Sequence, residues 1–278
     1  MACQIQVTGI WLQGRPIIFR IDQEWVGKRP LRKQGRLHTL AWHQDVQRIS
    51  MLKFAANLSL LFTEYDFLDR FQAAADSGFK GVEIQFPYAW DPETLGRKLS
   101  QSGLSLVLFN LPAGDWSAGD RGIACDPGRR DEFLAGLNKA VAYARILGTK
   151  QLNCLAGIPP QSISLVRAEA TFVENLRSAA KVCKTTGITL QMEAINTLDV
   201  PGFFLNTTAQ ARSILEKVGS DNLFLQYDIY HMQIMEGDLA RTLQANLECI
   251  KHIQLADNPG RHEPGTGEIN YPFLFNWL

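Results

Sequence analysis

The stretch LFLQYDIYH, residues 223–231, decides the fold of this chain and indicates where its chemistry lies. An apolar run leads directly into Asp228 and His231. A buried strand with this ending directs a carboxylate and an imidazole out of the carboxyl edge of a parallel sheet, where α/β folds place their active sites. A second apolar run ends on Glu193, and a third is followed closely by Arg261. Polar groups at several successive strand ends therefore predict an active site at this edge.

The same alternation of apolar runs and amphipathic segments repeats from residue 51 onward. We count seven such β/α units between residues 51 and 278, which predicts a parallel sheet covered by helices. The competing fold, an open doubly wound sheet, normally carries a glycine-rich phosphate loop, and the sequence has no GxGxxG or GxxxxGK motif. We therefore predict an α/β fold, a (β/α)₈ TIM barrel truncated after the seventh β/α unit. The eighth strand would lie beyond Leu278, so we expect unpaired edges on the predicted strands at residues 54–58 and 252–256.

Length and composition limit the possible classes of function. The chain has 278 residues, is 46% hydrophobic and carries 28 basic and 28 acidic side chains, so its net charge is zero. Balanced charge gives no reason to expect binding to nucleic acid or to an anionic membrane. No apolar run approaches the ~18 to 20 residues of a membrane span. The five cysteines form no CxxC pair, which is typical of reduced thiols, so we expect a cytoplasmic protein that acts on a small molecule.

Residues 1–50 differ in character from the rest of the chain. They hold eight Lys or Arg against three Asp or Glu and show no sustained periodicity. We predict that residues 1–50 form a basic N-terminal extension with little structure of its own, and that residues 51–278 form the barrel domain, with Met51 as the natural start. The segment lacks the apolar core of a secretory signal, and its acidic residues argue against a transit peptide. The alternative is a targeting or partner-binding arm.

Several long motifs resemble one enzyme family. They are FAANLS (54–59), NLPAGDW (110–116), RGIAC (121–125), QYDIYHMQ (226–233) and EPGTGEINY (263–271). Over residues 51–278 the chain resembles hydroxypyruvate isomerase, a member of the xylose isomerase-like barrels. The resemblance implies an aldose–ketose type isomerase, an intramolecular oxidoreductase, that interconverts hydroxypyruvate and tartronate semialdehyde in glyoxylate metabolism. It implies no organic cofactor, and it is compatible with an oligomer.

The resemblance also implies roles for the strand-end residues. Glu193 is the catalytic base, and His231 and Arg261 bind the substrate. A divalent metal would be held by Glu193, Asp228 and Gln254. Oxygen ligands of this kind suit Mg²⁺ or Mn²⁺, although Gln254 stands where a histidine is more usual, and the need for a metal stays open. The second catalytic glutamate of the family lies on the eighth strand, beyond Leu278, so we expect the chain as written to be unstable or weakly active.

The chemistry of the residues agrees with this function independently. Moving a carbonyl between adjacent carbons needs a base that removes a carbon-bound proton and groups that stabilise the resulting enediolate. A free glutamate titrates near ~4.3, so a useful base must have its pKa raised. Glu193 follows an apolar strand and is placed for that shift. Glu83 ends an earlier strand and is a further candidate for the wall of the site, and Glu268 could orient Arg261 or cap the last helix.

Each of these residues also has an ordinary structural interpretation. Asp228 or Glu193 could cap the next helix, His231 could be a hydrogen-bonded structural residue, and Arg261 could be a solvated loop residue. Three alternative functions remain as well. They are a related sugar epimerase, an isomerase of longer oxo acids, and a non-catalytic fragment. The DNA-repair nucleases of the superfamily use a histidine-rich zinc cluster, and only three histidines follow Met51.

Overall fold

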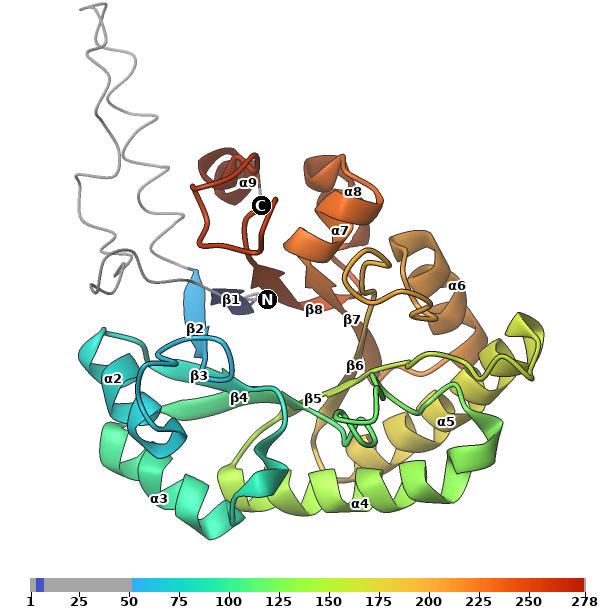
Figure 1. Ribbon diagram of the computed structural model, residues 1–278, viewed down its shortest axis with the longest axis horizontal. Coiled ribbons are helices and arrows are strands. Elements are labelled where there is room, and N and C mark those ends of the chain that lie inside the picture. Colours follow the sequence, from blue (N-terminus) through green and yellow to red (C-terminus); the bar gives the residue numbers. More distant parts are fainter. Residues whose placement is uncertain (1–3, 8–51, 278) are drawn as a thin grey trace, which may run out of the picture.

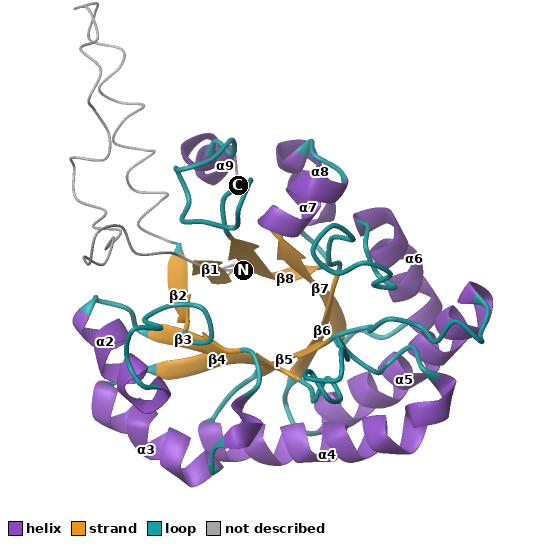
Figure 2. Cartoon of the chain, viewed as in Figure 1, coloured by secondary structure: helices purple, strands orange, loops and turns teal. Residues whose placement is uncertain are grey.

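The computed structural model describes residues 4–7 and 52–277, the first of these ranges by its backbone alone. Eight parallel strands form a closed barrel in the order β1 to β8, with helices on its outside (Figures 1 and 2). The strands are β1 (Gln4–Val7), β2 (Lys53–Asn57), β3 (Gly81–Ile84), β4 (Ser105–Asn110), β5 (Gln151–Cys154), β6 (Thr189–Glu193), β7 (Leu223–Asp228) and β8 (Ile250–Leu255). The predicted TIM barrel and its seven β/α units after residue 51 are confirmed.

The helices follow the strands in the expected alternation. They are α2 (Arg70–Asp76), α3 (Pro92–Ser102), α4 (Arg130–Leu147), α5 (Leu165–Thr185), α6 (Thr208–Val218), α7 (Ile229–Met235), α8 (Leu239–Asn246) and α9 (Tyr271–Trp277). Short 3₁₀ turns, η1 (Phe67–Asp69), η2 (Pro87–Ala89) and η3 (Pro127–Arg129), precede α2, α3 and α4. Gly103 and Gly148 end α3 and α4 with φ of 64° and 72°, a left-handed conformation that glycine adopts without strain.

Strand β1 corrects one expectation from the sequence. It pairs in parallel with β2, Gln4 beside Lys53, and with β8, Gln4 beside His252. The edges of β2 and β8, expected to lack partners, are therefore both paired, because an N-terminal strand occupies the gap between them. Residues 8–51 lie outside the described residues, so the predicted boundary at residue 51 and the predicted lack of structure of that segment stay predictions.

The core has two chemical layers. Apolar side chains of the helices and strands, such as Phe71, Leu137 and Phe172, fill the space between the barrel and its helices. Several strand residues inside the barrel are polar and nearly inaccessible, among them Asn153, Gln226 and His252. Buried polar groups need hydrogen-bond partners, and these strands end in the polar network described below. No helix of the described residues is long and apolar enough to cross a bilayer.

Candidate active site

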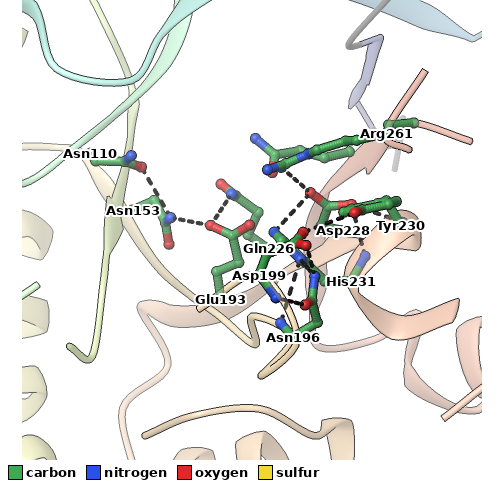
Figure 3. A network of polar contacts seen from close by, with 12 residues as sticks. Asn110, Asn153, Glu193, Asn196, Asp199, Gln226, Asp228, Tyr230, His231 and Arg261 are labelled. Atoms are coloured by element: carbon green, nitrogen blue, oxygen red, sulfur yellow. Dashed lines mark hydrogen bonds and ion pairs between the residues drawn. The ribbon is translucent and has the colours of Figure 1, made fainter. Parts of the chain in front are cut away.

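A cavity of about 120 Å³ lies at the carboxyl ends of the strands. Its ionisable lining residues are Glu83, Glu193, Asp199, His231 and Arg261. Gln254 also lines it, and Asp228 lies directly behind, bonded to Arg261. The structure thus brings together all five residues that the sequence predicts for the site (Figure 3 shows four of them labelled). Glu83, the further wall candidate, is confirmed as a lining residue.

Glu193 is buried at the end of β6 and is held on one side only. Its Oε2 accepts hydrogen bonds from Asn153 Nδ2 at 2.8 Å and from Gln226 Nε2 at 2.7 Å (Figure 3). Its Oε1 accepts none from the described residues. Burial and, to a smaller extent, the nearby charge of Asp228 raise the pKa of Glu193 to about 8, while Arg261 acts in the opposite direction. A carboxylate in this state can take up and give back a proton near neutral pH.

Asp228 serves two purposes at once. Its Oδ1 accepts from the backbone N–H of Tyr230 at 2.9 Å and of His231 at 3.4 Å, so it caps α7. Its Oδ2 lies 3.0 Å from Arg261 Nη2 and faces the site. Asp228 therefore caps α7 and also contacts a residue that lines the cavity, so the capping interpretation is confirmed and its functional role stays a prediction. The cap also starts α7 immediately after β7, which orients His231 toward the carboxyl end of the barrel.

Arg261 is placed by the loop that follows β8. Asp257, fully buried, holds this loop by accepting from the backbone N–H of Asn258, Gly265 and Ile269. Arg261 itself has φ of 57°, an uncommon value for a residue with a side chain. Its guanidinium carbon lies 5.2 Å from the centre of the Tyr230 ring, and its buried Nε has no hydrogen-bond partner among the described residues. Arg261 lines the cavity, so its guanidinium is placed to bind an anionic ligand.

His231 is buried beside Asp228. Its Nε2 lies 3.6 Å from Asp228 Oδ2, and its Nδ1 lies 2.6 Å from Asn196 Nδ2. Burial lowers the pKa of His231 to about 4, against the opposing effect of Asp228. The ring is therefore neutral at physiological pH, and each of its nitrogens has a distinct hydrogen-bonding role.

Gln254 and Glu83, which both line the cavity, contact each other. Gln254 Nε2 donates to Glu83 Oε2 at 3.2 Å, which leaves the amide oxygen of Gln254 as its free ligand atom. Burial raises the pKa of Glu83, and the neighbouring His252 opposes that rise. Glu268 was expected to orient Arg261 or cap the last helix, and it does neither. Its carboxylate instead accepts hydrogen bonds from Asn258 Nδ2 and Gln233 Nε2, because the loop after β8 and helix α7 place these two amides next to it.

Sequence reasoning missed the neutral polar residues that organise the charged ones. They are Asn110, Asn153, Asn196 and Gln226, with Asp199 at the cavity wall. Asn153 and Gln226 each interrupt an apolar strand one or two residues from its end. Burying an amide in such a position destabilises the fold unless the amide is hydrogen-bonded. A single amide within an apolar strand is therefore a sequence signal for a buried polar contact. Trp116 and Phe86, 5.2 Å apart between ring centres, were also missed as lining residues.

The donor set of this site suits a divalent cation. One ligand atom each from Glu193, Asp228 and His231 lie within 4.8 Å of one another. Two buried carboxylates this close repel each other, and the free Oε1 of Glu193 is open to a ligand. A cation would relieve that repulsion. The residues therefore fit a metal ion, and the carboxylate oxygens and the amide oxygen of Gln254 are of the kind that hard cations prefer.

Comparison with known proteins defines the class. The family described as "Xylose isomerase-like TIM barrel" matches residues 71–278. The chain belongs to this family. Its closed barrel of eight parallel strands agrees with that membership.

Within the family, the chain is similar to named isomerases. It is 55% identical to a hydroxypyruvate isomerase of Escherichia coli (strain K12), over 81% of this chain and 87% of that protein. It is 45% identical to a 2-oxo-tetronate isomerase of Cupriavidus necator, over 81% and 86%. Among solved structures, one titled AP endonuclease, family 2, from Brucella melitensis has a TM-score of 0.79 at 43% identity, covering 81% of this chain and 87% of that one.

Proposed function

We propose that this chain is an oxo-acid isomerase that interconverts hydroxypyruvate and tartronate semialdehyde by proton transfer through an enediolate. The observation that carries the proposal is Glu193, a buried carboxyl with a pKa of about 8, in the same small cavity as the guanidinium of Arg261. The names of the relatives from E. coli and C. necator, both isomerases of small oxo acids, support the same reaction class.

Glu193 is the base in this scheme. Its carboxylate removes a proton from the hydroxymethyl carbon of hydroxypyruvate, and the electron pair of that C–H bond forms the enediolate double bond as the ketone oxygen gains negative charge. Protonated Glu193 then delivers a proton to the former ketone carbon. The oxygen of that carbon ends as a hydroxyl, and the former hydroxymethyl oxygen loses its proton and becomes the aldehyde. A pKa near neutrality lets one group act in both directions.

Arg261 and His231 bind and stabilise the substrate. The guanidinium of Arg261 lines the cavity and is suited to the substrate carboxylate, because a guanidinium donates charge-assisted hydrogen bonds to such groups. His231 is neutral and turns Nε2 toward the carboxylate of Asp228 and the site. A donor there would stabilise the oxygen that gains charge in the enediolate. Asp228 holds Arg261 in place and keeps the pKa of Glu193 high.

We propose Mg²⁺ or Mn²⁺ as the cation of this site, with Glu193, Asp228 and Gln254 as its ligands. When bound, such an ion polarises a substrate oxygen and favours its negative charge. We further propose a cytoplasmic role in glyoxylate metabolism. We propose that residues 1–50 are an extension of the isomerase domain, apart from β1 (Gln4–Val7), which is a strand of the barrel itself.

The names of the similar isomerases favour a short oxo acid as the substrate. A related sugar epimerase is therefore the weaker alternative. A four-carbon oxo acid remains the closest competitor. Among the described residues the one possible metal cluster contains a single histidine, so nothing in it supports a zinc nuclease.

A coupled assay tests the proposal. Hydroxypyruvate is supplied with and without Mg²⁺ or Mn²⁺, and the tartronate semialdehyde formed is reduced by a coupling enzyme. The wild type should turn over, and Glu193→Gln should lose about 10³-fold in kcat. Glu216→Gln is the matched control, because Glu216 is exposed on α6. Absence of turnover in the wild type under every metal condition would reject the proposal.

A further inference from the structure

The two ring nitrogens of His231 face opposite kinds of hydrogen-bonding group. Nδ1 lies 2.6 Å from the side-chain nitrogen of Asn196 and 3.4 Å from its backbone nitrogen. Nε2 lies 3.6 Å from Asp228 Oδ2, on the side of the cavity (Figure 3). Both His231 and Asn196 are buried. The hydrogen of the neutral ring must therefore be placed by these neighbours.

The orientation of the Asn196 amide is fixed by Asp199. The backbone N–H of Asp199, which can only donate, lies 2.7 Å from Asn196 Oδ1. The carboxylate Oδ2 of Asp199 lies 3.1 Å from Asn196 Nδ2 and also accepts from Tyr230 Oη at 2.8 Å. Turning the amide over would set N–H against N–H and carbonyl oxygen against carboxylate. The amide nitrogen must therefore face both Asp199 and His231, and it has one hydrogen for each.

This arrangement selects one tautomer of the ring. Nδ1 receives a hydrogen from Asn196, so it is the acceptor, and the ring hydrogen lies on Nε2. The distance of 3.6 Å to Asp228 Oδ2 is too long for a hydrogen bond. The Nε2–H group is thus free to donate to a molecule in the cavity. A nitrogen that carries a hydrogen has no lone pair in the ring plane for a metal.

We propose that Asn196 is a positioning residue that holds His231 in the Nε2–H tautomer, so that His231 donates to a substrate oxygen and does not ligate a cation. The donation from His231 to a substrate oxygen rests on the proposed isomerase function, and the assignment of the Nε2–H tautomer does not. The chain Tyr230–Asp199–Asn196–His231 thus sets the polarity of a group at the reaction centre.

Nitrogen-15 NMR of the full chain tests the tautomer directly. Two-bond correlations from the ring protons distinguish a protonated ring nitrogen from an unprotonated one, and the signals of His231 are those that disappear in His231→Gln. Near neutral pH the wild type should show Nε2 protonated and Nδ1 bare. Addition of Mg²⁺ should leave this pattern unchanged. A wild-type Nδ1–H tautomer, or loss of Nε2–H on adding Mg²⁺, would overturn the inference.

Variants of Asn196 test its role. In Asn196→Asp a carboxylate replaces the donor, so the ring hydrogen should move to Nδ1. In Asn196→Ala, which adds no charge, both tautomers should appear. Asn206→Asp is the matched control, because Asn206 lies in the same β6–α6 connection and its side-chain amide donates to the backbone carbonyls of Phe203 and Phe204. An unchanged tautomer in both Asn196 variants, or an equal change in the control, would refute the role of Asn196.

Kinetics separate this inference from the proposed function. Asn196→Asp should lose about 10²-fold in kcat, the usual cost of one lost donor to a developing oxyanion, with a smaller change in KM. His231→Gln retains an acceptor toward Asn196 and a donor toward the cavity, so it should keep more activity than His231→Ala. Equal loss in these two variants would refute the donor role of His231. If the wild type shows the Nε2–H tautomer but no turnover, the isomerase proposal fails while the tautomer assignment stands.

Discussion

The two walls of the cavity differ in composition. The charged wall, at the ends of β6 and β7 and in the loop after β8, consists of Glu193, Asp228, His231 and Arg261. The neutral wall lies beyond Glu83 of β3, at the end of β4 and in the connections after β3 and β4, and consists of Phe86, Leu108, Asn110 and Trp116. The strands of the two walls lie on opposite sides of the barrel (Figure 2).

We propose that the charged wall carries out the chemistry and that the neutral wall helps to bind the substrate. On the charged wall, burial and neighbouring charges shift the pKa values of the ionisable groups. Burial and Asp228 raise the pKa of Glu193, and burial lowers the pKa of His231. The neutral wall adds no charge and limits the space beside these groups. We expect changes on the charged wall to act on kcat and changes on the neutral wall to act on KM.

Among changes to the two walls, we expect Asp228→Asn to cause the largest loss of kcat/KM. The change removes the charge partner of Arg261 and lowers the pKa of Glu193, because the nearby negative charge is lost. We expect kcat/KM to fall by about 10²- to 10³-fold, in the range of a lost electrostatic contribution at the reaction centre. Asp221→Asn is the control, because Asp221 is exposed and pairs only with Lys184 at the surface. Equal loss in the control would mean that the effect is not local.

The next largest effect is expected in the dependence of kcat/KM on pH. Glu193 acts as a base only when ionised, and its pKa of about 8 lies above the ordinary value. Without added metal, kcat/KM should therefore rise with pH and level off above about pH 8. Mg²⁺ favours the carboxylate and should move the midpoint to lower pH. A midpoint near the ordinary value of 4.5 in the absence of metal would contradict the assigned environment of Glu193.

A smaller effect is expected from the neutral wall. Trp116 lies against Phe86 and under the guanidinium of Arg121, 4.1 Å from its ring centre. Trp116→Ala should raise KM by about 10-fold, the low end of what a lost pocket contact costs, and leave kcat nearly unchanged. Trp277→Ala, in α9 and outside the cavity lining, should change neither. A kcat loss comparable to that of Asp228→Asn would remove the distinction between the walls.

The smallest effect concerns stability. The pKa of Glu193 is raised by folding, so the folded protein holds this proton more tightly than the unfolded chain. The resulting stabilisation is complete below about pH 4.5 and is lost as pH rises through about 8. The amide in Glu193→Gln cannot ionise, so the Tm of this variant relative to the wild type should increase between pH 5 and 9, by roughly 2 to 4 °C for each kcal/mol. Parallel Tm curves in thermal unfolding would contradict the raised pKa.

The sequence predicts the barrel and the charged wall well. Apolar strands that end on Glu193 and Asp228 locate the carboxyl edge, and the family resemblance adds His231 and Arg261. The sequence alone cannot show that one oxygen of Asp228 caps α7 while the other contacts Arg261, because these two contacts depend on the three-dimensional arrangement. The roles assigned to these residues stay proposals.

Other parts of the structure have weak signals in the sequence. Asn153 and Gln226 are single amides within apolar strands, and their significance depends on Glu193 lying between them in space. The link from Asn196 to His231 spans two β/α units. Strand β1 is four residues long, in a segment without periodicity, and its partners β2 and β8 are far away in the sequence.

The most direct test of the account is exchange of carbon-bound hydrogen. Hydroxypyruvate is incubated in D₂O with wild type, Glu193→Gln or Glu216→Gln, and deuterium at its hydroxymethyl carbon is followed by proton NMR against an enzyme-free control. We expect rapid incorporation with the wild type and Glu216→Gln, and none above background with Glu193→Gln. Incorporation by Glu193→Gln at the wild-type rate would contradict the claim that Glu193 moves the proton.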